Sequence, residues 1–138
     1  MVESKRKKFD EWGVSENNLL KQIKNPLQNE VDFCDLVQLT KILSTANRHI
    51  LNSFFGEEGL LILLSILQTK TNIENLRELD YGLILQTLRC LKAVMNTSIG
   101  MEGFLSVKDL VKNVVKCLYF EYKPIALMVI LYASYFLE

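Results

Sequence analysis

The chain has 138 residues and no formal net charge, and 49% of its residues are hydrophobic and 23% charged. This length and hydrophobic content suffice for one domain with a buried core and exclude a globally disordered chain. Two prolines and six glycines supply too few turns for an all-β fold. A nucleic-acid-binding protein is not expected either, because the basic residues cluster only at Lys5–Lys8.

Residues 1–14 are expected to be a basic, flexible N-terminus. A localisation or membrane-surface signal is the alternative interpretation of Lys5–Lys8. No apolar stretch typical of a secretory signal follows these residues. The three cysteines, Cys34, Cys90 and Cys117, lie in apolar helical patterns without zinc or redox spacing. We therefore expect buried free thiols in a reducing compartment.

Apolar residues recur at helical spacing through most of the remaining chain. In chain order, the predicted helices span residues 15–25, 31–46, 49–55, 59–69, 83–95, 98–105, 107–118 and 124–137. Ser15 and Ser106 are the predicted N-caps of the first and seventh helices. Asn47 and Asn96 are predicted to end the second and fifth. The polar segment from Gln68 to Asp80 is the longest predicted loop.

Three of these helices are strongly apolar. The fourth has large apolar residues on nearly all faces and should be buried between neighbours; they are Leu60, Leu61, Leu63, Leu64, Ile66 and Leu67. The seventh has one predicted inward stripe, formed by Leu110, Val111, Val114, Val115 and Leu118. The apolar run Ile125–Leu137 is shorter than the ~17–25 residues of a transmembrane helix, which predicts a core helix.

An internal repeat organises these helices. The first unit reads LVQLTKILSTAN, RHILNSFF and GEEGLLILLSIL, and the second reads LQTLRCLKAVMN, TSIGMEGFL and SVKDLVKNVVKCL. Asn47 and Asn96 occupy equivalent positions in the sequences of the two units. Units of three helices that recur in this way predict an all-α, armadillo-type α-solenoid over residues 15–138, with the last helix opening a third unit.

The last predicted helix is apolar to its end, and no polar capping helix follows it. In a solenoid each unit buries its faces against the next one. We therefore expect either a fragment of a longer solenoid or a short homologue that covers this face by self-association. A homo-oligomer formed through the C-terminal helix is the corresponding prediction.

The segments NSFFGEEGLLILLSIL and LRCLKAVMNTSIGMEGFL resemble two signatures of the regulatory region of diaphanous-related formins, its GTPase-binding and formin homology 3 armadillo repeats. The resemblance covers roughly residues 30–137. It implies a module that binds a GTP-loaded Rho-family GTPase. It also implies a competing partner, the amphipathic autoinhibitory helix from the formin's C-terminus. Residues 1–30 are too short for the helical GTPase-binding subdomain that precedes the repeats in this family.

The same resemblance implies control of actin filament nucleation by a domain that lies outside this sequence. Actin is therefore an indirect partner, and the implied location is the cytoplasm, at the cytoskeleton and cell cortex. A generic armadillo scaffold that binds proteins without a GTPase is the alternative function.

Candidate binding residues follow from the resemblance position by position. The corner that touches the GTPase in the family matches Thr45, Ala46, Asn47 and Arg48. Arg48 departs from the family's asparagine-rich pattern, and Asn47 has the alternative role of merely ending a helix. The residues that match the autoinhibitory-helix site are Lys92 and Asn96, with an apolar floor of Ala133, Phe136 and Leu137. Plain inter-repeat core is the alternative for the last three.

Catalysis is not expected from this sequence. His49 is the only histidine, so no histidine pair or histidine-rich metal cluster can form. The phosphate-binding patterns GxxxxGK[ST] and GxGxxG do not occur. We therefore predict a binding protein that is not an enzyme and that needs no cofactor or metal.

Overall fold

The structure is a computed structural model that describes residues 12–25, 30–72, 76–117 and 122–136. Within these ranges the chain forms eight α-helices and no strand, which confirms the predicted all-α class. The helices are α2 (Val14–Lys24), α3 (Phe33–Ser44), α4 (Arg48–Gly56), α5 (Gly59–Thr71), α6 (Glu78–Met95), α7 (Ser98–Ser106), α8 (Leu110–Lys116) and α9 (Lys123–Phe136).

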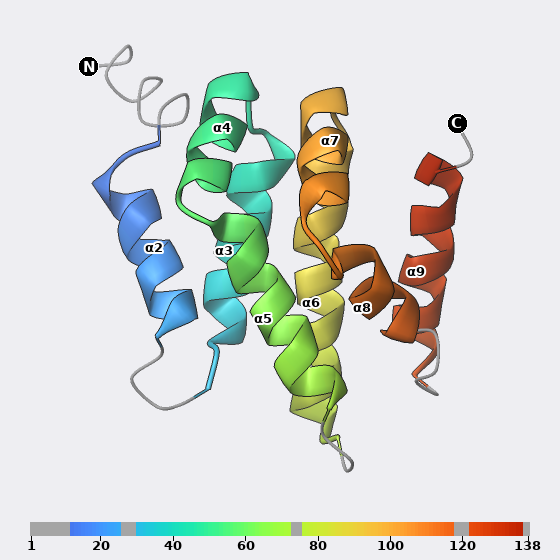
Figure 1. Cartoon of the computed structure of the whole chain (residues 1–138). Helices are drawn as coiled ribbons and strands as arrows, with labels where there is room; N and C mark the ends of the chain where they lie inside the picture. The colour runs from blue at the N-terminus through green and yellow to red at the C-terminus, as the bar shows by residue number, and fades with distance from the viewer. Residues whose placement is uncertain (1–11, 26–29, 73–75, 118–121, 137–138) are drawn as a thin grey trace.

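The helices stack in three rows. α3, α6 and α9 lie side by side and end at the same edge of the molecule, the upper edge in Figure 1. α4 packs on α7, and α5 packs on both α2 and α8. The units α3–α5 and α6–α8 therefore have the same arrangement, while α2 takes the place of a preceding third helix and α9 that of a following first helix. This stacking confirms the armadillo-type solenoid.

Equivalent side chains recur in the two units. Phe54 of α4 and Phe104 of α7 are both completely buried. Asn47 caps α4 by accepting a hydrogen bond from the backbone N–H of Ile50, and Thr97 caps α7 in the same way. The counterpart of Asn47 is therefore Thr97, not Asn96 as predicted. Asn96 is instead the C-cap residue of α6.

The third helix of each unit begins after an acidic residue in the left-handed conformation, Glu58 with φ 61° and Asp109 with φ 71°. This conformation reverses the chain sharply and costs of order 1 kcal/mol for a residue other than glycine. In the first unit the reversal presses Gly59 against Phe54, where a Cβ would lie 2.1 Å from the ring. In the second unit it starts α8 at Leu110, so the predicted cap at Ser106 is wrong.

Some of the apolar residues predicted to be buried are exposed in the structure. Most of the α5 leucines are buried as predicted, but Leu61 is 50% exposed. Of the predicted stripe on α8, Leu110 and Val114 are buried, whereas Val111 and Val115, on the adjacent side of the helix, are exposed. Leu118 lies outside the described residues. Cys90 and Cys117 are buried as expected, but Cys34 is exposed because it lies in the first turn of α3.

The ends of the chain's helices differ from prediction by a few residues. α2 begins at Val14 with Gly13 as its cap, so Ser15 is not the cap residue. Just before it, the indole N–H of Trp12 donates to the side chain of Asn17 and its ring packs on Phe54, so the last residues of the predicted flexible N-terminus join the fold.

At the other end of the described chain, the last helix joins the core through buried Ile125 and Val129, as predicted for a core helix. Among the described helices, none is both long and apolar enough to cross a membrane alone. α4 and α5 meet that criterion only together, and they are bent by 61°.

Candidate functional site

The first predicted corner connects α3 to α4 at the upper edge in Figure 1. Ala46 is half-buried and packs against the core, which anchors the corner. Thr45, Asn47 and Arg48 are exposed around it. The Oδ1 atom of Asn47 accepts from the N–H of Ile50 at 2.9 Å. This side chain therefore begins α4 rather than ending α3, and the corner holds its exposed polar groups in a fixed backbone turn.

The second predicted corner connects α6 to α7. Lys92 lies half-buried in the last turn of α6, and Asn96 is exposed at its C-cap. Thr97 Oγ1 accepts from the N–H of Gly100 at 3.0 Å and so begins α7. Space here is tight, because a Cβ at Gly100 would lie 1.6 Å from the carbonyl oxygen of Val94.

Stacking brings the two corners together. α3 packs along α6, and α4 packs on α7, so the α3–α4 and α6–α7 corners are neighbours at one edge (Figure 1). The predicted GTPase-binding residues and the pair Lys92 and Asn96 therefore share this edge. A protein bound at one corner would extend over the surface beside the other corner.

The third part of the predicted site falls on α9, which also ends at this edge (Figure 1). Ala133 and Phe136 belong to α9, but their side chains are outside the described residues, as is Leu137 altogether. The described half of α9 has two faces: Ile125 and Val129 are buried, whereas Leu127 and Ile130 are exposed. An exposed apolar face therefore runs along α9.

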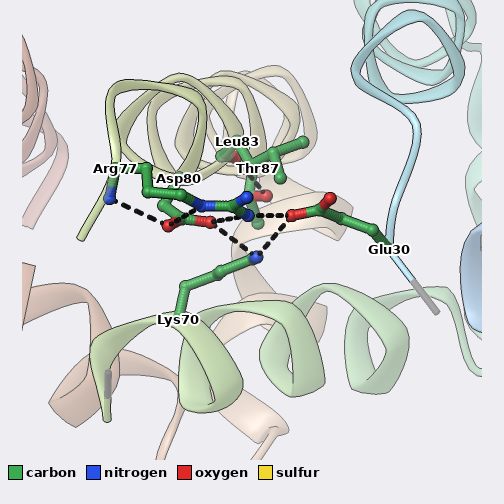
Figure 2. A network of polar contacts seen from close by, with 6 residues as sticks. All are labelled: Glu30, Lys70, Arg77, Asp80, Leu83 and Thr87. Carbon is green, nitrogen blue, oxygen red and sulfur yellow. Dashed lines mark hydrogen bonds and ion pairs between the residues drawn. The ribbon is translucent and has the colours of Figure 1, made fainter. Parts of the chain in front are cut away.

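The opposite edge holds a compact ion network that the sequence interpretation missed (Figure 2). Lys70 of α5 contacts Asp80 of α6 at 2.8 Å and Glu30, which precedes α3, at 3.5 Å. Arg77 binds the same two carboxylates, and its backbone N–H donates to Asp80 at 2.9 Å. The network thus fastens the end of α5 and the start of α6 to the segment before α3, which is distant in sequence.

Asp80 is the centre of this network and is only 2% exposed. Burial by itself would raise the pKa of its carboxyl. Hydrogen bonds from the side chain of Lys70 and from the backbone and side chain of Arg77 outweigh that effect and hold the pKa well below its ordinary value. Asp80 is therefore a buried, fully charged carboxylate whose partners are all in place.

A signal for this network is present in the sequence. Lys70 continues the buried face of α5 through Leu63 and Leu67, at helical spacings of four and three. A lysine on a buried face needs an anionic partner. Asp80 was instead assigned to a long loop, but α5 continues to Thr71 and α6 already begins at Glu78.

Two of the three cysteine thiols lie in the core. Burial raises the pKa of the Cys90 and Cys117 thiols to about 12, which keeps them protonated and unreactive. His49 is exposed on the short helix α4. In the described ranges, no three His, Cys, Asp or Glu side chains gather as metal ligands.

Stacked three-helix units with exposed polar corners define a protein-binding module of the armadillo class. The chain belongs to the Diaphanous GTPase-binding Domain family, whose sequence model matches residues 4–131. The match takes in α2 as well as both repeat units. No curated protein sequence and no solved structure gave a match. The family is a regulatory, GTPase-binding domain of diaphanous-related formins rather than a catalytic one, and it confirms the resemblance seen in the sequence.

Proposed function

We propose that the chain binds the GTP-loaded form of a Rho-family GTPase through the corner Thr45–Arg48. The family supplies the class of partner, a small GTPase. The corner supplies exposed donors and acceptors on a fixed turn, which suits recognition of a mobile switch region that changes shape with the nucleotide.

The same proposal includes an autoinhibitory amphipathic helix bound beside Lys92 and Asn96, along α9. The observation that carries it is the adjacency of the two corners, because neighbouring sites at one edge make the two partners compete. Release of the helix by the GTPase would then free an actin-nucleating domain elsewhere in the protein. The proposed location is accordingly the cytoplasm at the cell cortex, which a fluorescent fusion of the chain would test.

Titration calorimetry with a Rho-family GTPase in its two nucleotide states tests the first part. We expect tighter binding of the GTP form, and weaker binding by an Asn47→Asp variant. Aspartate also caps helices well, so this variant should keep the melting temperature of the wild type. Equal binding of the two nucleotide states would exclude an effector and leave a generic armadillo scaffold.

Competition tests the second part. An amphipathic helical peptide from a formin C-terminus should bind the chain and be displaced by the GTP-loaded GTPase. Asn96→Asp should weaken the peptide while leaving the GTPase affinity within about twofold, because Asn96 lies outside the first corner and a single rim charge has a modest effect. Simultaneous binding of both partners would contradict the proposed switch.

Self-association through α9 is a separate proposal, based on its exposed apolar face. Ile130 is 59% exposed, and Leu127 lies on the same side one turn before it. Exposed apolar patches of this kind mark interfaces. Light scattering should show mass increasing with concentration, and Ile130→Glu should reduce it. A monomer at all concentrations would exclude this proposal.

A further inference from the structure

A second surface, on α8 and the adjoining part of α5, combines uncompensated positive charge with exposed apolar side chains. Lys112 and Lys116 are exposed on α8 and lie one turn apart, so they share a face. Val111 and Val115 are also one turn apart and exposed, and Val115 is 46% exposed. α8 thus presents a basic row beside an apolar row.

A hollow of about 410 Å³ lies beside the turn that precedes α8. Its wall includes Phe55, Leu61, Val107 and Lys108. Leu61 lines the hollow with half of its surface exposed, although the other large apolar residues of α5 are buried. The hollow thus lies beside the turn that precedes α8, and a third lysine, Lys108, is in its wall.

The three lysines are not neutralised within the described part of the chain. The ion pairs found there involve Lys70 and Arg77, and none involves Lys108, Lys112 or Lys116. α8 itself holds Lys112 and Lys116 and no acidic residue, and Asp109 directly precedes it. The wall of the hollow holds one lysine, Lys108, and one acidic residue, Glu58. α8 therefore carries a net positive charge.

We propose that this surface is a docking site for an acidic amphipathic helix of a partner protein. Carboxylates one turn apart on that helix would match Lys112 and Lys116, its apolar side chains would cover Val111 and Val115, and one large apolar side chain would enter the hollow. In Figure 1, α5 and α8 lie in front of α3 and α6, whereas the two corners lie at the upper edge, so this surface differs from the corner site.

Two features favour a helix over an anionic membrane as the occupant. A bilayer surface is flat and would leave the hollow unfilled, whereas a helix presents single protruding side chains. Glu58 in the hollow's wall would also face lipid phosphates, which carry the same charge. A peptide can meet Glu58 with a basic side chain.

The test uses the whole chain and a fluorescent, helix-stabilised peptide with glutamates every fourth position beside leucines, followed by fluorescence anisotropy. The variant Lys108→Glu, Lys112→Glu, Lys116→Glu should lower the affinity about tenfold or more, because each exposed ion pair adds a modest amount. Added salt should weaken peptide binding by the wild type and have little effect on peptide binding by this variant.

A matched control reverses three exposed lysines on α2 and α3, Lys21→Glu, Lys24→Glu and Lys41→Glu. Its peptide affinity should stay within about twofold of the wild type. Leu61→Ser tests the apolar part independently of charge and should weaken binding about threefold or more. Circular dichroism melting of each variant establishes that it is folded.

Four results would overturn the proposal. They are no binding of the peptide by the wild type, equal losses in the control and the α8 variant, binding of phosphatidylserine vesicles in place of the peptide, and a self-association that the α8 variant abolishes. The last two would assign the surface to a membrane or to a second copy of the chain. GTPase binding should be unchanged in the α8 variant, so this test is independent of the function proposed above.

Discussion

At the edge where α5 ends and α6 begins, four charged side chains bind one another, and the central one, Asp80, is nearly inaccessible to solvent. At the opposite edge, the two corners expose Asn47, Arg48 and Asn96. Both edges are polar and both terminate helices of the same repeat units.

The difference lies in what satisfies the polar groups. At the network edge, each charge has a partner from another segment, so the residues hold the units together. At the corner edge, the capping hydrogen bonds are local, since Asn47 accepts from the N–H of Ile50 and Thr97 accepts from the N–H of Gly100. Thr45, Asn47 and Arg48 are exposed around the first corner, which is why the corners are the better candidates for recognition.

The largest expected effect is on the network edge. Asp80→Asn removes the central charge and leaves buried Lys70 with only Glu30, at 3.5 Å. Breaking a buried ion pair by removing one partner costs about 3–5 kcal/mol of unfolding free energy. Urea unfolding followed by circular dichroism measures this loss.

Glu78→Gln is the matched control for that variant. It removes a negative charge from the same first turn of α6, but Glu78 is exposed. Only the interaction with the helix dipole is lost, about 0.3–1 kcal/mol. Equal losses of unfolding free energy in the two variants would show that the network stabilises the fold no more than an exposed charge in the same turn does.

A smaller effect of the same network should appear at acid pH. The pKa of Asp80 is lowered in the folded protein, so its stabilisation is complete above the ordinary value of 3.8 and is lost as the pH falls below it. The difference in unfolding free energy between the wild type and Asp80→Asn should therefore shrink between pH 5 and pH 3. A constant difference across that range would contradict the lowered pKa.

The next effect concerns the backbone of the second corner. Gly100→Ala would place a methyl group against the carbonyl oxygen of Val94, which cannot move without shifting α6. Overpacking of this kind costs about 1–3 kcal/mol. Gly56→Ala is the control, because nothing lies within 4 Å of a Cβ there and its φ is not positive. That substitution should stabilise by about 0.4–1 kcal/mol. Similar thermal stabilities of the two variants would show that the corner is not tightly packed.

Local pattern was enough to predict the solenoid. Leucines at helical spacing mark the buried faces, and the repeated order of long, short and long helices marks the units. The corner residues were also located in advance, through the family resemblance, because they follow directly from the ends of those helices. Their roles as binding residues remain predictions.

The remaining features depend on contacts between distant residues or on backbone geometry. The network joins Glu30 to residues forty or more positions later, and no local pattern pairs them. α8 begins after a left-handed turn at Asp109, and Val111 and Val115 are exposed on it although their spacing fits a buried stripe. Helical periodicity predicts which residues share a face but does not determine whether a neighbouring helix covers it.

The smallest effect on stability is expected at Asn47, where two substitutions separate capping from recognition. Asn47→Ala removes the acceptor for the N–H of Ile50 and should cost about 1 kcal/mol of unfolding free energy. Asn47→Asp keeps an acceptor at the positive end of the α4 dipole and should change stability by less than about 0.5 kcal/mol. If the corner binds the GTPase, affinity should fall in both variants although stability falls in only one. The contrary result is that Asn47→Asp binds the GTPase like the wild type and only the destabilised Asn47→Ala binds it more weakly. That result would show that Asn47 acts only as a cap and that the recognition surface lies elsewhere.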